Sequence, residues 1–397
     1  MRKHRRTRLG PADVDGAPGK QGLRTQMTLR CVTCGHDHPL TDLPWRCARC
    51  HGVLDLAGFT AAMPDRATLR DRPPTLWRYA EALPVGEPPD ISMGEGMTPL
   101  LGIPGQPGLA LKADYLMPTG SFKDRGAALL VALAGELSVT RMVADSSGNV
   151  GAAIAAYATR AGMACDVYVP AAASTGKLAQ LLAYGATVHR VEGSREDTAA
   201  AAAAAADEPG TFYASHVYNP FFLHGTKTYV FELWEQLGGQ LPRTLVLPVG
   251  NGTLVLGAYL GCKELLEQRL IDRIPVIVAV QAAACAPLAN AFNDGLSAPA
   301  SVTAEATAAE GIAIGVPARG HQILAAVRET AGKIVTVTDD QIIAAYKALA
   351  RAGLYVEPTA ATSWAAASTG VAGIPATPGP QPHAVVPLCG SGLKSAR

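Results

Sequence analysis

The chain of 397 residues is long enough for two or three domains, and 48% of its residues are hydrophobic, which is ample for a large core. Its formal net charge of +1 favours neither a nucleic-acid nor a membrane partner. No apolar run approaches the ~20 residues of a membrane span, and no apolar segment near the N-terminus is typical of a secretory signal. Four of the eight cysteines are clustered and four are scattered among apolar segments, so we expect a reduced, cytoplasmic protein without a disulfide framework.

Residues 1–26 are basic and rich in Gly, Pro and Arg, and they show no hydrophobic periodicity. This composition predicts a disordered basic tail. A nucleic-acid-binding arm is the weaker alternative, because short basic tails are usually only solvated.

Two C-x-x-C pairs follow, Cys31 with Cys34 and Cys47 with Cys50, with twelve residues between the pairs. Such knuckles can place four thiolates tetrahedrally around Zn²⁺, and four thiolates leave no open position for catalysis. The spacing therefore predicts a structural zinc ribbon over 27–60, with four free cysteines as the alternative. Three nearby histidines are competing ligands, although we expect each at the surface: His36, His38 and His51.

The segment 60–105 is rich in proline and is expected to wrap around the core, with Trp77, Tyr79 and Leu83 packed inward. From residue 109 onward, short apolar runs alternate with longer helical patterns, which is typical of parallel sheets covered on both faces. The predicted strands are 141–144, 165–169, 188–191, 245–248, 276–280, 334–337 and 384–388. The predicted helices are 149–161, 177–184, 226–237 and 340–352, and the alanine-rich run 199–205 favours a solvated helix.

One lysine, Lys123, lies in the run 118–126 among small and turn-forming residues. Two turns rich in glycine and in hydroxyl or amide side chains occur later, at 145–151 and 248–253, and such turns present backbone N–H groups to anions. A lysine with anion-binding turns predicts a carbonyl cofactor that carries a phosphate and is held as an imine, and pyridoxal 5′-phosphate (PLP) fits this description. The alternative is a loop with a surface lysine and two ordinary helix caps.

These three stretches, in this order, resemble threonine synthase and its relatives in the tryptophan-synthase-β (fold type II) group of PLP enzymes. The Ser-Phe-Lys-Asp-Arg-Gly run is highly specific for this group, and the resemblance extends from about residue 29 to residue 394. It implies an α/β fold with two parallel-sheet domains and the active site between them. On this resemblance we expect a large PLP-binding domain over 61–134 and 241–397, with a smaller domain over 135–240 inserted in it. Relatives in this group often form homodimers, so a homodimer is expected, with a small amino acid as substrate.

The resemblance also assigns roles to residues. Lys123 would form the imine with PLP and then act as the base that moves the substrate α-proton. Asn149 would bind the 3′-oxygen of the cofactor, and Cys389 would meet the pyridine nitrogen, where relatives carry threonine or, in some dehydratases, cysteine. Glu357 resembles a residue beside the ring and is expected either to be a wall residue or to pair with a backbone group, without a catalytic role. The substrate carboxylate would meet Ser146, Ser147 and Gly148, and the cofactor phosphate would meet Gly250, Asn251, Gly252, Thr253 and Leu254.

The resemblance implies conversion of O-phospho-L-homoserine and water to L-threonine and phosphate, by γ-elimination and β-addition. However, the group commonly has arginine near Phe222 and a hydroxyl at the position of Val150, both of which suit a phosphorylated substrate. Three residues are candidates to replace these contacts: His216, His224 and Lys227. The alternatives are β-elimination, as in a serine or threonine ammonia-lyase, β-replacement on another activated amino acid, or a zinc-ribbon binding protein with an inactive enzyme body.

Overall fold

The computed structural model describes residues 27–394, apart from 43, 87–89, 104, 105, 107, 147, 174, 194 and 375–381. The predicted tail at 1–26 therefore lies outside the described residues. None of the helices in the described ranges combines the length and the hydropathy that a bilayer crossing requires.

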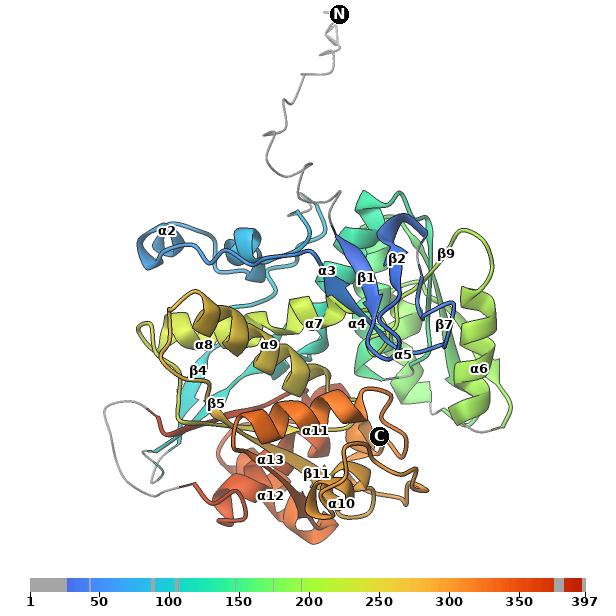
Figure 1. Ribbon diagram of the computed structural model, residues 1–397. Helices are drawn as coiled ribbons and strands as arrows, with labels where there is room; N and C mark the ends of the chain where they lie inside the picture. The colour runs from blue at the N-terminus through green and yellow to red at the C-terminus, as the bar shows by residue number, and fades with distance from the viewer. Residues whose placement is uncertain are drawn as a thin grey trace, which may run out of the picture.

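The larger of two parallel sheets has six strands in the order β12-β11-β10-β13-β5-β4, and all neighbours are parallel except β4 and β5 (Figure 1). Two helices, α9 and α11, pack together on one face, and α12 and α13 pack on the other. The strands are β4 (Leu100–Gly102), β5 (Leu109–Lys112), β10 (Thr244–Pro248), β11 (Val276–Ala282), β12 (Lys333–Val337) and β13 (Ala384–Pro387). The helices are α8 (Thr228–Gln236), α9 (Thr253–Glu267), α10 (Pro287–Asn293), α11 (Gly320–Glu329), α12 (Asp339–Arg351) and α13 (Pro358–Ser368).

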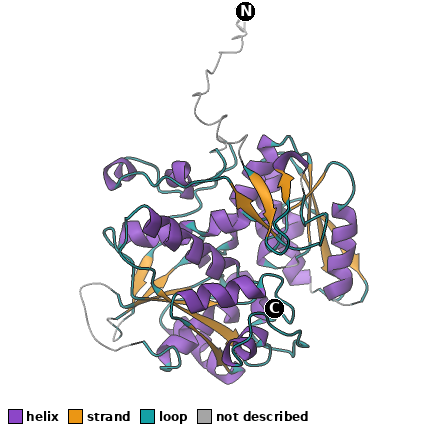
Figure 2. Ribbon diagram, viewed as in Figure 1, coloured by secondary structure: helices purple, strands orange, loops and turns teal. Residues whose placement is uncertain are grey.

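The smaller parallel sheet has four strands in the order β8-β7-β6-β9, and it lies beside the larger one with its own covering helices (Figure 2). Helix α3 packs against α4 and α7, and α7 packs in turn against α9 of the larger sheet, so these helices join the two halves of the molecule. The strands are β6 (Arg141–Ala144), β7 (Ala164–Pro170), β8 (Thr187–Val191) and β9 (Thr211–Tyr213). The helices are α3 (Lys123–Glu136), α4 (Asn149–Arg160), α5 (Thr175–Ala183), α6 (Arg195–Ala206) and α7 (Phe221–Thr226).

Each predicted strand is present. β6, β10, β11 and β13 are short apolar runs that are buried along almost their whole length, as expected for inner strands of parallel sheets. β8, at the edge of the smaller sheet, has no fully buried residue. The predicted limits of the two domains remain predictions. Helix α8, which lies inside the predicted smaller domain 135–240, packs in the core of the six-stranded sheet. The expectation of a solvated helix at 199–205 is wrong in part, since Ala202 and Ala205 of α6 are buried against Val143 of the four-stranded sheet.

The predicted helix 226–237 is divided at Lys227 into α7 and α8. The Thr226 hydroxyl donates to the Leu223 carbonyl at 3.1 Å, and the Thr228 hydroxyl donates to the Gly225 carbonyl at 2.7 Å. These bonds to carbonyls three residues back compete with the backbone hydrogen bonds of a continuous helix, and the helix is interrupted between them.

The N-terminal segment forms a small antiparallel sheet of β1 (Thr28–Cys31), β2 (Asp37–Pro39) and β3 (Leu54–Ala57), followed by helix α2 (Arg66–Arg70). Beyond it the chain crosses the core, where Trp77, Tyr79 and Leu83 are buried as predicted. Helix α12 begins at Asp339, one residue before the predicted start, and Thr338 caps it, since the Thr338 side chain and Gln341 form reciprocal hydrogen bonds.

Candidate active site

The predicted site motifs follow the carboxyl ends of strands that lie side by side. The turn 249–252 follows β10, Leu388 and Cys389 follow β13, and the run that leads to Lys123 follows β5. Since β10, β13 and β5 are parallel neighbours, these segments meet at one edge of the six-stranded sheet. The start of α4 follows β6 of the smaller sheet and faces the same edge, because Asn149 contacts Glu357 directly.

Lys123 is the first residue of α3, and its backbone is tied to the end of β13. The Phe122 amide donates to the Cys389 carbonyl at 2.9 Å, and the Ser391 amide donates to the Gly120 carbonyl at 2.9 Å. The half-buried side chain places Nζ 3.3 Å from Thr253 Oγ1, which is the one hydrogen bond of this ammonium within the described ranges. Burial lowers the pKa of Lys123 to about 8, although Cys389 and Glu357 oppose this shift. The amine is therefore closer to its neutral, nucleophilic form than an exposed lysine.

A buried ion-pair network fixes the first turn of α3. The Arg125 guanidinium is fully buried and donates to Asp114 at 2.8 Å and to Glu232 of α8 at 2.5 Å. The pKa of Arg125 lies well above its usual range, because these two carboxylates outweigh burial, which acts in the opposite direction. This fixed turn holds Lys123 at the edge where the two halves meet.

Asn149 and Glu357 link the two halves across the site. The Asn149 Nδ2 atom donates to both carboxylate oxygens of Glu357 at 3.0 Å, from the first residue of α4 to the residue before α13. Burial raises the pKa of Glu357, against the effects of Asn149, Lys394 and Lys123. A Cβ on Gly390 would lie 2.3 Å from Glu357 Oε1, so a larger residue there would displace the carboxylate that Asn149 binds. The sequence placed Glu357 at the wall of the site but gave no sign of its bond to Asn149.

The turn before α9 is shaped to bind an anion. Gly252 has φ +79° at the N-cap of this 15-residue helix, and a Cβ there would lie 2.3 Å from Ile323 Cδ1. A Cβ on Gly250 would lie 2.9 Å from Ile312 Cα. Since glycine is required at both positions, the backbone N–H groups at the start of α9 remain free of side chains beside the predicted phosphate. Thr253 and Leu254 are buried here, and Asn251 is half-buried.

The other predicted site residues flank this centre. Cys389 is buried, and burial raises the pKa of its thiol well above the usual range, so the thiol is neutral. At the start of α4, the Gly148 amide donates to Ser146 Oγ at 3.3 Å. Ser147, which was predicted to bind the substrate carboxylate, lies outside the described residues.

Of the three residues predicted to replace phosphate contacts, only His216 lies beside the site. Its Nε2 atom is 3.4 Å from Asn251 Nδ2, and its ring is 5.9 Å from the Phe222 ring. Phe222 is buried against Gly126, and its ring centroid is 5.9 Å from Lys123 Nζ. Val150 is also buried, so an apolar side chain occupies each of the two positions where relatives commonly carry arginine or a hydroxyl.

His224 and Lys227 belong to a different cluster. Lys227 Nζ is 2.7 Å from Glu264 Oε1 and 2.9 Å from His224 Nδ1, and it lies 5.0 Å from the Phe59 ring. His224 and Glu264 line a separate groove of ≈ 590 Å³ between α7, α9 and α11. Both residues therefore have their hydrogen-bond partners in this cluster.

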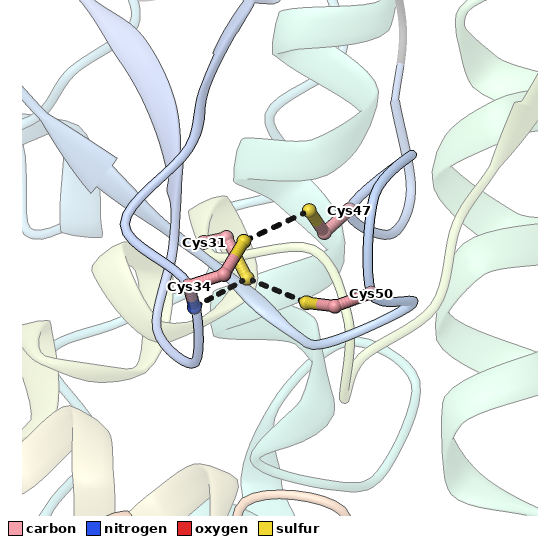
Figure 3. A group of neighbouring side chains, drawn as sticks. All are labelled: Cys31, Cys34, Cys47 and Cys50. Carbon is pink, nitrogen blue, oxygen red and sulfur yellow. Dashed lines mark hydrogen bonds between the residues drawn. The ribbon is translucent and has the colours of Figure 1, made fainter.

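The four N-terminal cysteines converge from two loops, as Figure 3 shows. All four Sγ atoms lie within 4.8 Å of one another, with 3.4 Å between Cys31 and Cys50 and 3.6 Å between Cys34 and Cys47. Although burial acts in the opposite direction, hydrogen bonds from the Cys34 amide and from Cys50 lower the pKa of Cys31 to about 6. This donor set can hold one tetrahedral metal ion.

The histidines near this cluster differ from one another. His36 and His51 are exposed as expected, whereas the expectation of a surface position is wrong for His38, which is buried with 7% of its surface exposed. A hydrogen bond from the His38 side chain helps to lower the pKa of Cys47 to about 7, against the effect of burial. His38 therefore supports the cysteine cluster from beside it.

Comparison with known proteins decides the family. Residues 91–390 match the sequence model of the family described as pyridoxal-phosphate dependent enzyme. The chain belongs to this family. Threonine synthase of Methanosarcina acetivorans is 34% identical over 84% of this chain and 84% of its own length, and threonine synthase of Methanocaldococcus jannaschii is 36% identical over 85% and 86%.

Solved structures agree on the fold. Threonine deaminase of T.th. is 30% identical, with a TM-score of 0.63 over 74% of this chain and 92% of that chain. Maize serine racemase is 21% identical, with a TM-score of 0.65 over 75% and 88%, and this similarity shows the fold alone. The protein is a threonine synthase-like, PLP-dependent lyase of fold type II.

The residues at the predicted site fit the cofactor of this PLP-dependent enzyme family. The amine of Lys123 is half-buried and has a lowered pKa, which suits covalent attachment of a carbonyl group. Turn 250–252 brings bare backbone N–H groups to the N-terminus of α9, which suits a phosphate. Asn149, Glu357 and Cys389 supply an amide, a carboxylate and a neutral thiol to the same edge.

Proposed function

We propose that this enzyme is a threonine synthase, which converts O-phospho-L-homoserine and water to L-threonine and phosphate in cytoplasmic amino-acid biosynthesis. The proposal is carried by Lys123 beside the phosphate-binding turn, in a chain that is 34–36% identical to two threonine synthases over most of its length. The PLP-dependent family supplies the general chemistry, and these relatives support the particular reaction.

Bound PLP supplies an electron-withdrawing ring that stabilises negative charge at the substrate carbon. Lys123 holds the cofactor, and its amine removes and returns the substrate α-proton, for which a pKa of about 8 is suitable. Asn149, whose Nδ2 donates to Glu357 in the structure, would donate one N–H to the cofactor 3′-oxygen, and Cys389 would be the neutral partner of the pyridine nitrogen. The substrate carboxylate binds at the start of α4, at Ser146, Ser147 and Gly148. The cofactor phosphate binds at Gly250, Asn251, Gly252, Thr253 and Leu254.

One set of observations favours a second reaction class, β-elimination from serine or threonine, or β-replacement on another activated amino acid. Phe222 and Val150 are apolar, and Lys227 is fully buried in its pair with Glu264. A leaving phosphate that faced Phe222 and Val150, with Lys227 already paired elsewhere, would lose charge-assisted hydrogen bonds. The 30% identity to a threonine deaminase also supports this alternative.

A substrate titration of the purified holoenzyme separates the two proposals. O-phospho-L-homoserine, serine, threonine and O-phosphoserine are added separately, and phosphate, ammonia and threonine are measured. We expect phosphate release and threonine formation from O-phospho-L-homoserine. Ammonia release from serine or threonine, with no response to O-phospho-L-homoserine, would replace the first proposal with the second.

We also propose that Cys31, Cys34, Cys47 and Cys50 bind a structural Zn²⁺ ion. Their four sulfur atoms form a compact cluster, and the lowered pKa of Cys31 favours the thiolate that a metal requires. With all four positions taken by sulfur, the ion would have no place for substrate. Metal analysis of the purified protein tests this proposal, and a sample without bound zinc would contradict it.

A further inference from the structure

Arg319 is a fully buried arginine outside the predicted site, at the residue before α11. Its guanidinium joins three separate parts of the chain. The Nε atom donates to the Val217 carbonyl at 2.6 Å, and Nη2 donates to the Tyr218 carbonyl at 3.2 Å and to the Leu54 carbonyl at 2.7 Å. The Nη1 atom donates to Asp55 Oδ1 at 2.6 Å and to Gln322 Oε1 at 2.8 Å.

Two of these partners, Leu54 and Asp55, belong to β3 of the cysteine ribbon. The ribbon reaches the same region by a second contact, because the Trp45 ring packs edge-on at 5.1 Å against both Tyr213 and Tyr218. Segment 213–218 is therefore contacted both by Trp45 of the ribbon and by Arg319.

Segment 215–219 carries His216 to the phosphate-binding turn. The segment is a compact turn, in which Ser215 Oγ accepts from the Val217 amide at 3.3 Å and the Ser215 carbonyl accepts from the Asn219 amide at 3.1 Å. His216 extends from this turn to Asn251, with 3.4 Å between Nε2 and Nδ2. Because Arg319 binds the carbonyls of residues 217 and 218, it also restrains His216, which contacts Asn251.

Arg319 also borders the turn from the other side. Four residues after it, Ile323 of α11 packs against Gly252, where a Cβ would lie 2.3 Å from Ile323 Cδ1. The guanidinium bond to Gln322 lies within the same first turn of α11. Arg319 is therefore connected to the turn by two routes, through His216 to Asn251 and through Ile323 to Gly252.

We propose that Arg319 is a positioning residue for the cofactor phosphate site. It holds segment 215–219 so that His216 supports Asn251, and it makes the cysteine ribbon part of the active-site scaffold. The inference rests on the proposed role of residues 250–254 in binding the cofactor phosphate. It predicts that loss of the Arg319 fork weakens PLP binding without changing chemistry in the loaded enzyme.

The test is the PLP dissociation constant of Arg319→Lys, measured by titrating apoenzyme with PLP and following its visible absorbance. Lysine keeps the charge but loses the fork that reaches three carbonyls, so we expect about tenfold weaker binding. At saturating PLP, kcat should stay within about twofold, because no reacting group has changed. The matched control is Arg78→Lys: Arg78 is also buried, but it donates to Leu69, Pro73 and Glu235, away from segment 215–219. Its variant should lose stability and keep the wild-type dissociation constant.

A double-mutant cycle tests whether Arg319 acts through His216. If it does, Arg319→Lys combined with His216→Ala should bind PLP no more weakly than His216→Ala alone, within about twofold. Multiplicative losses would contradict this route. An unchanged dissociation constant in a folded Arg319→Lys protein would overturn the whole inference.

Two further variants keep the outcome decisive. If Arg319→Lys does not fold, Asp55→Asn removes only one charge from the network, and we expect about twofold to threefold weaker PLP binding. A folded Asp55→Asn protein with wild-type binding would then overturn the inference. Gly252→Ala separates this inference from the proposed function. If this variant binds PLP as tightly as wild type, residues 250–254 do not bind the cofactor phosphate, and the proposed function itself is contradicted.

Discussion

Lys123 opens α3 and Lys227 joins α7 to α8, and burial lowers the pKa of both amines from 10.5 to about 8. Lys227 is completely buried, and its ammonium has fixed partners in Glu264 and His224. Lys123 is half-buried, and its hydrogen bond in the described part of the chain goes to the Thr253 hydroxyl. A lowered lysine pKa therefore does not identify a reactive amine.

The difference lies in what surrounds each amine. The Lys227 ammonium is paired within the protein with the Glu264 carboxylate and the His224 ring. The Lys123 site is bordered by the start of α9, the start of α4 and the end of β13, all of which offer polar groups that a cofactor can use. Comparison of the two lysines by mutation therefore tests the site assignment against a matched buried lysine.

The largest expected effect is on turnover. Lys123→Ala should reduce kcat by more than ~10³-fold, because it removes both the cofactor attachment and the base. The protein should keep its thermal stability, since no buried ion pair is broken. Initial rates and thermal unfolding of the purified variant measure the two quantities, and undiminished turnover would end the assignment of Lys123.

Lys227→Met should show the opposite pattern. It leaves Glu264 buried without its partner, so the free energy of unfolding should fall by ~3–5 kcal/mol. Turnover per folded molecule should stay within about twofold of wild type, because Lys227 does not face the site. Urea denaturation and active-site titration measure these values. The double variant Lys227→Met with Glu264→Gln should recover part of the lost stability, and loss of turnover at full stability would place Lys227 in the site.

The cysteine ribbon should affect stability without changing chemistry. Cys31→Ser should abolish zinc binding and lower the free energy of unfolding by at least ~2 kcal/mol, because the fourth thiolate is lost. Cys262→Ala is the control, since Cys262 is a fully buried cysteine remote from the cluster. It should leave the zinc content unchanged. Equal zinc in wild type and Cys31→Ser, measured by mass spectrometry of the metal, would remove Cys31 from the ligand set.

The smallest effect is a shift in pH dependence. Only the neutral amine of Lys123 can capture the cofactor, and its pKa of about 8 means that the protonated form dominates below this pH. The rate at which apoenzyme captures PLP should therefore rise about tenfold per pH unit below pH 8 and level off above it. Stopped-flow absorbance measures this rate. A rise that continues to the ordinary pKa of 10.5 would show that the Lys123 amine is not perturbed.

Local sequence predicted much of the fold. The run at β6 is a short apolar stretch between polar residues, and the strand has the predicted bounds Arg141–Ala144. The start of α12 was equally clear, because Thr338 can cap a helix whose first turn contains Asp339 and Asp340. The two turns at 145–151 and 248–253 follow the predicted strands 141–144 and 245–248, which the structure contains as β6 and β10, since glycines and polar residues interrupt the apolar pattern there.

Contacts between distant segments could not be predicted. Arg319 and Val217 are 102 residues apart, and Asn149 and Glu357 are 208 apart, so neither pair leaves a local pattern. His216, in the loop before α7, contacts Asn251, whereas His224, within α7, contacts Lys227. A loop and a six-residue helix have too little periodicity to predict these partners. The burial of His38 likewise depends on the fold around the cysteines.

The most direct test of the Lys123 assignment is to reduce the holoenzyme with borohydride, which fixes the cofactor to the amine that holds it, and to map the modified peptide by mass spectrometry. The account predicts one modified lysine, Lys123, with Lys227 unmodified in the same digest. Modification of Lys227 or of any other lysine in place of Lys123 would contradict it.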